Sequence, residues 1–406
     1  MLVGVDASRA FIKNRTGIEE YSYQVIKHLV NELSEHEVVL YVRDGQQSVV
    51  NSQKFPNNWK VRVIRWPYLW SQIGLSLEML LHPIDVLFIP AHTVPIIHPA
   101  RNASLFSLAL FIQKILKIFG ISTYYNQHGV AGGPKNTIVT VHGLEYEFCS
   151  EAYSLWERIY MRWSIKNSCK WAKKIIAVSE NTKKDLMDLY TVLEEKVEVI
   201  YEGYDASANF QFPISNFQAN SNEQIPRPYL LFIGRIENRK NIAGILGAYK
   251  ILVEKYKIPH ALVLAGTPGY GYDIIKLKIN HYLKIKNLKL KIIELGYINE
   301  AQKWQLLSNA EVFIFPSLYE GFGLPILEAQ NAGVPVVSSN ISSILEVADG
   351  SVLLVSPYKP EEIAESVYKL ISNEALKKDM INIGYENIKR FSWEKCAREI
   401  AGILNE

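Results

Sequence analysis

The stretch IFPSLYEGFGLPILEAQNAGVPVVSS, residues 314–339, has the pattern of a buried strand, a glycine turn, a helix and a second strand. Pro325 suits the first helical position, and Gly333 suits the position just past the helix end. Glu320 then lies in the loop before the helix, and Glu328 lies in its first turn. Both carboxylates are expected at the same helix mouth, and the next question is which ligand they would bind there.

The same alternation of strands and helices extends outward along the whole chain. Short apolar runs alternate with helical patterns, among which residues 17–33 carry an apolar stripe at helical spacing. Continuous apolar strands between helices favour parallel sheets covered on both faces. VPVVSS is expected to be the last strand. We therefore predict an α/β protein of two doubly wound, Rossmann-like parallel-sheet domains that face an interdomain cleft.

A polar, proline-containing stretch without periodicity separates the two halves of the pattern. The 406 residues suit two domains of ordinary size. We expect an N-terminal domain over residues 1–209, a linker over 210–228 and a C-terminal domain over 229–389. The tail helix, about residues 390–406, could pack back on the first domain.

Composition excludes several classes of protein. A formal net charge of +3 gives no general argument for nucleic acid, and 48% hydrophobic residues are typical of a globular chain. Three scattered cysteines without a CxxC pair indicate a reducing, cytoplasmic compartment and no structural zinc. We expect no secretory signal before the first strand. The apolar run 104–120 is too short to span a bilayer, and a buried helix and an interfacial helix both remain open.

The sequence lacks the common nucleotide and metal motifs. It contains no GxGxxG after the first strand, no GxxxxGK[ST] and no Asp-x-Asp pair. A bound diphosphate would then need protein cations. In FIGRIENRKN, Arg235 follows a strand and Lys240 precedes a helix, which is where cations and backbone amides meet phosphate. The alternative is a pair of ordinary surface cations.

Two carboxylates beside a helix N-terminus suit a ligand that combines hydroxyl groups with phosphate. Glu320 and Glu328 would accept hydrogen bonds from a sugar and a ribose, and the helix amides would meet an anion. A nucleotide sugar has this chemistry. The alternatives are a solvated loop charge for Glu320 and stabilisation of the helix dipole for Glu328. In the first half, Gly17 opens a helix whose amide could approach a diphosphate. His142 follows a strand, where it could bind a sugar or be structural.

Several motifs together resemble one enzyme family: RTGIEEYSYQVIKHL, VHGLEYE, VEVIYEGYD, LFIGRIENRKN and SLYEGFGLPILEA. The sequence resembles the retaining glycosyltransferases of the GT-B fold, family 4, and the two glutamates around GFGLP are the specific element. The resemblance implies a hexosyltransferase that moves a sugar from a nucleotide-sugar donor with retention of configuration and without a metal. The acceptor would be a glycan or a lipid-linked glycan. Similarity to mannosyltransferases of polysaccharide assembly favours GDP-mannose, while UDP- and ADP-sugars remain open.

The resemblance also implies a role for each matched position. Arg235 and Lys240 would hold the donor diphosphate in place of a metal, and Glu320 would position the donor sugar. The implied catalytic set is His142, Arg235, Lys240 and Glu320. The implied donor-binding set is Gly17, Gly296, Tyr297, Ile298, Phe322, Gly323, Leu324 and Glu328, with 296–298 at the nucleobase and Glu328 at the ribose.

Two further hypotheses concern partners and rival functions. The insertion 99–135 would shape the acceptor site or contact a membrane. Residues 158–174 carry cations at four-residue spacing, which suits anionic lipid or a solvated helix face. The rival functions are a nucleotide-sugar epimerase of the same architecture and a catalytically silent nucleotide-sugar-binding subunit.

Overall fold

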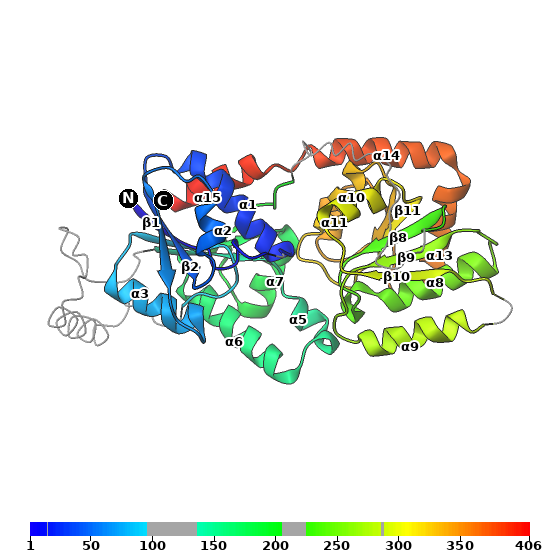
Figure 1. Cartoon of the computed structure of the whole chain (residues 1–406), viewed down its shortest axis with the longest axis horizontal. Coiled ribbons are helices and arrows are strands. Elements are labelled where there is room, and N and C mark those ends of the chain that lie inside the picture. The colour runs from blue at the N-terminus through cyan, green and yellow to red at the C-terminus, as the bar shows by residue number, and fades with distance from the viewer. Residues whose placement is uncertain (14, 96–135, 205–224, 286–287) are drawn as a thin grey trace. The chain divides into compact units, whose positions relative to one another are not determined.

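The computed structural model describes residues 1–13, 15–95, 136–204, 225–285 and 288–406 (Figure 1). Most of the predicted linker 210–228 lies outside the described residues, as do the insertion 99–135 and its apolar run 104–120. The chain divides into two compact units. The first unit comprises residues 1–143, 159–203 and 392–406, and the second comprises 144–158 and 204–391.

The first unit is built on a parallel sheet, which among the described residues has seven strands in the order β3-β2-β1-β4-β5-β6-β7. The strands are β1 (Leu2–Asp6), β2 (Glu37–Arg43), β3 (Trp59–Ile64), β4 (Val86–Ile89), β5 (Asn136–Val141), β6 (Lys174–Ala177) and β7 (Val197–Val199). The main helices are α1 (Gly17–Glu32), α2 (Gln47–Asn51), α3 (Leu75–Leu81), α6 (Leu155–Trp171), α7 (Glu180–Tyr190) and α15 (Trp393–Leu404). The first four residues of α6 belong to the second unit.

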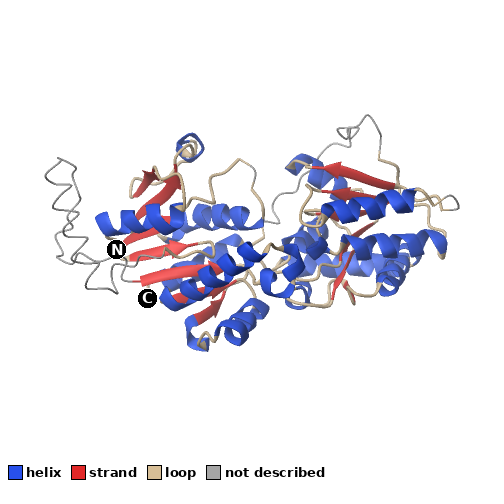
Figure 2. Ribbon diagram, turned by 90° about the horizontal axis from the view of Figure 1, so that it is seen from below, coloured by secondary structure: helices blue, strands red, loops and turns tan. Residues whose placement is uncertain are grey.

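The centre of this sheet is apolar because β1 lies between two other strands. Val3 pairs with Val38 of β2 on one side and with Val86 of β4 on the other. All three side chains are buried. A strand with neighbours on both edges and helices over its faces has no exposed side, which explains its continuous apolar sequence. Figure 2 shows helices alongside the strands of each unit.

The C-terminal helix α15 belongs to the first unit and packs on α1. The Tyr21 and Trp393 rings meet edge to face with centroids 5.9 Å apart. Gly203 lies so close to the start of α15 that an added Cβ would come within 2.4 Å of the Trp393 backbone. At the far end of the helix, the Asn405 side chain hydrogen-bonds His36. The chain therefore returns to its N-terminal half for its last helix.

The second unit has a parallel sheet in the order β10-β9-β8-β11-β12-β13 among the described residues. The strands are β8 (Tyr229–Ile233), β9 (Ala261–Ala265), β10 (Ile292–Gly296), β11 (Val312–Phe315), β12 (Val336–Ser339) and β13 (Leu353–Val355). The main helices are α5 (Glu145–Phe148), α8 (Ile242–Glu254), α9 (Tyr272–Leu283), α10 (Glu300–Leu307), α11 (Leu324–Asn331), α12 (Ile344–Ala348), α13 (Pro360–Ser372) and α14 (Glu374–Ile388).

The two sheets confirm the predicted parallel α/β class, with two differences in detail. VPVVSS, which forms β12, is not the last strand, because β13 pairs with its outer edge. β13 is three residues long and lies in the short apolar run VLLV, residues 352–355, which the sequence analysis did not assign to a strand. The segment Leu144–Arg158 lies in the second unit, although the residues on both sides of it belong to the first. Among the described residues, no helix is long and apolar enough to cross a membrane.

Candidate functional site

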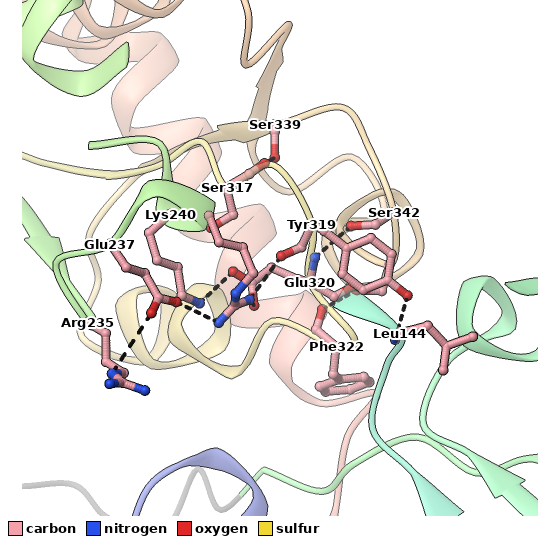
Figure 3. A network of polar contacts seen from close by, with 12 residues as sticks. Leu144, Arg235, Glu237, Lys240, Ser317, Tyr319, Glu320, Phe322, Ser339 and Ser342 are labelled. Atoms are coloured by element: carbon pink, nitrogen blue, oxygen red, sulfur yellow. Dashed lines mark hydrogen bonds and ion pairs between the residues drawn. The ribbon is translucent and has the colours of Figure 1, made fainter. Parts of the chain in front are cut away.

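The candidate site lies where two neighbouring strands of the second sheet end. β8 and β11 pair in parallel through Leu231 and Phe313, so both chains leave the sheet at the same edge. The loop after β8 carries Arg235 and Lys240, and the loop after β11 carries Glu320. The parallel arrangement therefore brings together side chains that are about eighty positions apart in the sequence (Figure 3).

Asn241 fixes the loop that carries the cations. Its backbone adopts the left-handed conformation, with φ of 56°, which asparagine tolerates better than most residues. Its side chain accepts a hydrogen bond from the Gly244 N–H and caps α8. The same side chain donates to the carbonyls of Pro316 (3.1 Å) and Pro357 (2.6 Å). Asn241 thus ties the start of α8 to the end of β11 and places Lys240 between them.

Lys240 and Glu320 form a buried ion pair. Lys240 Nζ lies 2.6 Å from Glu320 Oε1, and the two residues are 9% and 7% exposed. The ammonium also lies 4.8 Å from the centroid of the Phe315 ring. Burial raises the pKa of Glu320, but the charges of Lys240 and Arg239 outweigh it and hold that pKa below its usual range. The Glu320 carboxylate is therefore ionised at neutral pH.

Arg239 cross-links the same two loops. Its guanidinium lies 3.0 Å from Glu237 Oε1 and 3.4 Å from Glu320 Oε2, and Nη1 donates to the Tyr319 carbonyl at 3.1 Å. Burial lowers the pKa of Arg239, but the surrounding carboxylates, with Glu320 and then Glu145 first, raise it overall. Sequence reasoning missed Arg239 and Glu237. The adjacent cations in NRKN were an available signal for Arg239.

Arg235 differs from these buried cations. Its side chain is 63% exposed, and its Nε lies 3.9 Å from Glu237 Oε2. Figure 3 shows Arg235 to one side of the Lys240–Glu320 pair. The structure therefore places an exposed cation beside a buried ion pair. Among the described residues, no three His, Cys, Asp or Glu side chains are grouped so that they could hold a metal ion.

Further hydrogen bonds from two other segments fix the Glu320 loop. The Glu320 N–H donates to Ser342 Oγ at 3.0 Å, and the Ser343 hydroxyl donates to the carbonyls of Glu320 and Phe322. The Tyr319 hydroxyl accepts a hydrogen bond from the Leu144 N–H at 3.2 Å.

The segment 144–158 supplies more contacts to this loop. Phe148 stacks on the Tyr319 ring with centroids 4.9 Å apart. Glu145 lies near enough to raise the pKa of Arg239 through its charge, and burial raises the pKa of the Tyr153 hydroxyl, which stays neutral. Sequence reasoning missed Glu145, Tyr153 and Tyr319, because nothing in a local pattern shows that this segment packs beside the Glu320 loop.

The helix after the glycine turn corrects one prediction. α11 begins at Leu324, directly after Gly323, whose φ of 123° is in the region that favours glycine. Pro325 is therefore not its first residue, and Glu328 lies in the second turn and not in the first. The physical reason is that the chain turns into the helix one residue earlier than Pro325 suggested. Glu328 is consequently set back from the helix N-terminus.

Glu328 has a partner that the sequence analysis did not identify. Its Oε1 lies 2.7 Å from Lys303 Nζ on α10. Burial lowers the pKa of Lys303, but Glu328 and then Glu300 raise it overall. Phe322, before the turn, has a buried side chain that meets Phe391 edge to face. Gly323 and Leu324 stand at the N-terminus of α11, where backbone amides have no acceptor within the helix.

The segment predicted at the nucleobase lies at the end of β10. Gly296 is the last residue of this strand and has φ of 67°, and its carbonyl accepts a hydrogen bond from the Gly266 N–H. Tyr297 is 56% exposed, whereas Ile298 packs on the core. These residues share the carboxyl edge of the sheet with the Arg235 loop and are separated from it by β9.

His142 lies in the first unit, just after β5. Its Nδ1 is 3.1 Å from Glu202 Oε1, and its Nε2 is 2.9 Å from the Pro90 carbonyl. Both partners are hydrogen-bond acceptors. Sequence reasoning missed Glu202. The ring meets Tyr21 edge to face at 4.5 Å. A structural histidine would show the same contacts, and a role beside the donor sugar stays a prediction.

His92 lies beside this ring and is held neutral. The backbone N–H of His142 donates to His92 Nδ1 at 3.3 Å. Burial, followed by the charge of His142, lowers the pKa of His92 to about 3.

Gly17 is the first residue of α1, as predicted. An added Cβ would meet no atom within 4 Å, so packing in this unit does not demand glycine there. The neighbouring Thr16 N–H donates to Glu19 Oε2 at 3.2 Å, which caps the helix start.

Comparison with protein-family models gives two matches that follow each other along the chain. Residues 15–208 match Glycosyltransferase Family 4, and residues 214–387 match Glycosyl transferases group 1. Among curated relatives, the O-antigen chain mannosyltransferase B of Escherichia coli is 28% identical over 266 residues, which are 65% of this chain and 69% of the relative. The O-antigen chain mannosyltransferase RfbU of Salmonella typhimurium is 24% identical over 67% of this chain and 70% of its own length.

Solved structures show the same fold at low sequence identity. Anabaena Alr3699/HepE, in complex with UDP and glucose, aligns over 100% of this chain and 99% of its own with a TM-score of 0.66 at 16% identity. The sucrose-phosphate synthase of Thermosynechococcus elongatus aligns over 100% of this chain and 98% of its own with a TM-score of 0.69 at 17% identity. With both matched regions and both parallel sheets in place, the chain belongs to the family 4 glycosyltransferases and has the GT-B fold.

Proposed function

We propose that this glycosyltransferase moves mannose from GDP-mannose to a glycan or lipid-linked glycan acceptor, with retention of anomeric configuration and without a metal. The observation that carries the proposal is the buried Lys240–Glu320 pair beside the exposed Arg235, at the carboxyl edge of the second sheet. The named O-antigen mannosyltransferases among the relatives support mannose as the sugar. Structural neighbours in complex with UDP or UDP-glucose support a nucleotide-sugar donor in general.

In this proposal the cations take the role that a metal has in other transferases. Arg235 meets the donor diphosphate, since it is exposed and its nearest acidic partner is 3.9 Å away. Lys240 is held in place by Glu320, so it adds positive charge at a fixed position as the nucleotide leaves. A positioned cation needs no reorganisation during the reaction. The role of this pair is therefore electrostatic.

The carboxylates and glycines would position the rest of the donor. Glu320 accepts hydrogen bonds from the sugar hydroxyls, and Glu328 accepts them from the ribose. The amides at 322–324 meet the sugar or phosphate, and residues 296–298 contact the base. Gly17 gives a diphosphate room to approach its amide, which agrees with the space around its Cα. His142, oriented by Glu202, lies beside the donor sugar. We also propose that the enzyme works in the cytoplasm at the inner face of the membrane.

Product analysis tests this proposal. The purified full chain is incubated with GDP-mannose, UDP-glucose or ADP-glucose and a lipid-linked glycan, with and without EDTA. We expect one added mannose from GDP-mannose, the same anomeric configuration in donor and product by NMR, and no effect of EDTA. Lys240→Met should abolish transfer, while Lys250→Met, on the partly exposed face of α8, should leave it intact.

Other products would identify the rival functions. An epimerised nucleotide sugar without transfer would indicate an epimerase, and binding without any product would indicate a silent subunit. Loss of activity with EDTA would contradict metal independence.

A further inference from the structure

Helix α6, labelled in Figure 1, exposes a row of large apolar side chains. The exposed fractions are 66% for Leu155, 78% for Trp156, 48% for Ile159, 43% for Tyr160 and 42% for Trp163. At the helical repeat, these five positions fall on one side of the helix, within about 140°. The centroids of the Tyr160 and Trp163 rings lie 6.2 Å apart. Exposed apolar patches of this kind mark interaction surfaces.

The opposite side of α6 anchors the helix and fixes its orientation. Ser164, Ile165, Ser168 and Cys169 are buried. The Ser168 hydroxyl donates to a backbone carbonyl at 2.8 Å and accepts from a backbone N–H at 3.0 Å, both in the segment after β4. The apolar row is therefore turned outward by a well-anchored helix and does not result from fraying.

The net charge of α6 is positive, which favours an anionic partner. α6 contains four cations and one acidic residue, which gives +4 − 1 = +3. Lys166 and Lys170 are exposed and follow the apolar row on the same side. Glu157, the acidic residue, lies on a different side of the helix and accepts hydrogen bonds from Ser154.

We propose that the α6 aromatic face, defined as Leu155, Trp156, Ile159, Tyr160, Trp163 and Lys166, docks on an anionic lipid bilayer. Tryptophan and tyrosine favour the headgroup level, aliphatic side chains insert below it, and lysines meet anionic lipids. Leucine and isoleucine have no stacking role on a sugar, so the mixed face fits a bilayer better than a glycan. The inference rests on the proposed function in one respect: a lipid-linked acceptor resides in such a bilayer.

Vesicle flotation of the full chain tests this surface. The vesicles contain phosphatidylcholine alone or with phosphatidylglycerol. We expect flotation with the anionic vesicles, weakened by high salt and by Lys166→Glu. The double variant Trp156→Ala/Trp163→Ala should lower the partition coefficient by about tenfold or more, because each indole buries a large apolar area. Matched controls are Tyr358→Ala (73% exposed) and Lys389→Glu on the second unit, which should float like the wild type.

Several outcomes would overturn the inference. One is no flotation of the wild type with anionic vesicles at low salt, and another is an equal loss from Tyr358→Ala. A third is a wild-type oligomer that Trp156→Ala/Trp163→Ala converts to a monomer without vesicle binding, which would make the face an interface between copies. Mannose transfer to a soluble acceptor fragment is measured in parallel. Flotation without transfer refutes only the proposed function, and transfer without flotation refutes only the membrane surface.

Discussion

Glu320 to glutamine is the most informative single change in the candidate site. In the wild type, its carboxylate compensates the buried Lys240 ammonium at 2.6 Å and shares Arg239 with Glu237. The variant keeps the shape of the side chain but leaves Lys240 without its nearest carboxylate. Breaking a buried ion pair costs roughly 3–5 kcal/mol. Arg239 keeps other carboxylates, so we expect a loss near 3 kcal/mol in the free energy of unfolding.

A double-mutant cycle separates this coupling from other effects. Lys240→Met alone leaves Glu320 with Arg239, and Lys240→Met/Glu320→Gln removes both members of the close pair. The double variant should therefore be less destabilised than the sum of the single variants, by about 2 kcal/mol or more. The assay is native-state hydrogen exchange of the buried amides in β8 and β11, whose following loops carry the pair.

Additive effects of the two substitutions would contradict this coupling. If the two single effects sum to the effect of the double variant, Lys240 and Glu320 do not stabilise each other. A matched control is Lys369→Met on α13, whose exposed pair with Glu365 should contribute little. Lost transfer in all three site variants, with coupling intact, would show that the pair is both structural and needed for the reaction.

Three further predictions concern separate parts of the chain. Arg235→Ala should change the free energy of unfolding by no more than about 0.5 kcal/mol, because the side chain is exposed. The same variant should lower kcat/KM by about a hundredfold or more if Arg235 binds the donor diphosphate. Activity equal to that of the wild type would show that Arg235 is not part of the donor site. Lys303 is the ion-pair partner of Glu328. If Glu328 binds the ribose, Lys303→Met should raise the donor KM about tenfold with little change in kcat. A loss in kcat alone would contradict the ribose role of Glu328. The pKa of His92 falls from 6.5 to about 3 in the folded chain, so the unfolded chain takes up the proton first as the pH drops. The free energy of unfolding should then decrease by up to about 1.4 kcal/mol per pH unit as the pH falls from 6.5 to about 3. His92→Gln should reduce this dependence on pH. An unchanged dependence in the variant would contradict the lowered pKa of His92.

The architecture was predictable where burial imposes a strong pattern. Strands such as β8 and β9 are apolar throughout because both faces are covered, and α1 has a clear apolar stripe. The edge strand β13 has an apolar run of only four residues, VLLV, and the sequence analysis did not assign it. The placement of 144–158 in the second unit depends on contacts with the Glu320 loop, which no local pattern records.

The location of the candidate site was predictable from the ends of the strands, whereas the contact partners of its side chains were not. The rule that ligands bind beyond the carboxyl ends of parallel strands pointed to Arg235, Lys240 and Glu320 together. Glu202, Lys303 and other partners were not predicted, because they meet their targets only through the tertiary fold. The first-turn position of Glu328 was wrong because the helix starts at Leu324, one residue before Pro325. A shift of one residue is enough to move a side chain by about 100° around a helix.

Mannose transfer from GDP-mannose by the Lys240–Glu320 site, as proposed above, can be measured in one experiment. The most direct measurement is mass spectrometry of a lipid-linked glycan acceptor after incubation with GDP-mannose and either the wild-type chain or Lys240→Met. We expect one added hexose with the wild type and none with the variant, which should still retain its fold by circular dichroism. An unchanged acceptor with the wild type, or equal product from a folded Lys240→Met, would contradict it.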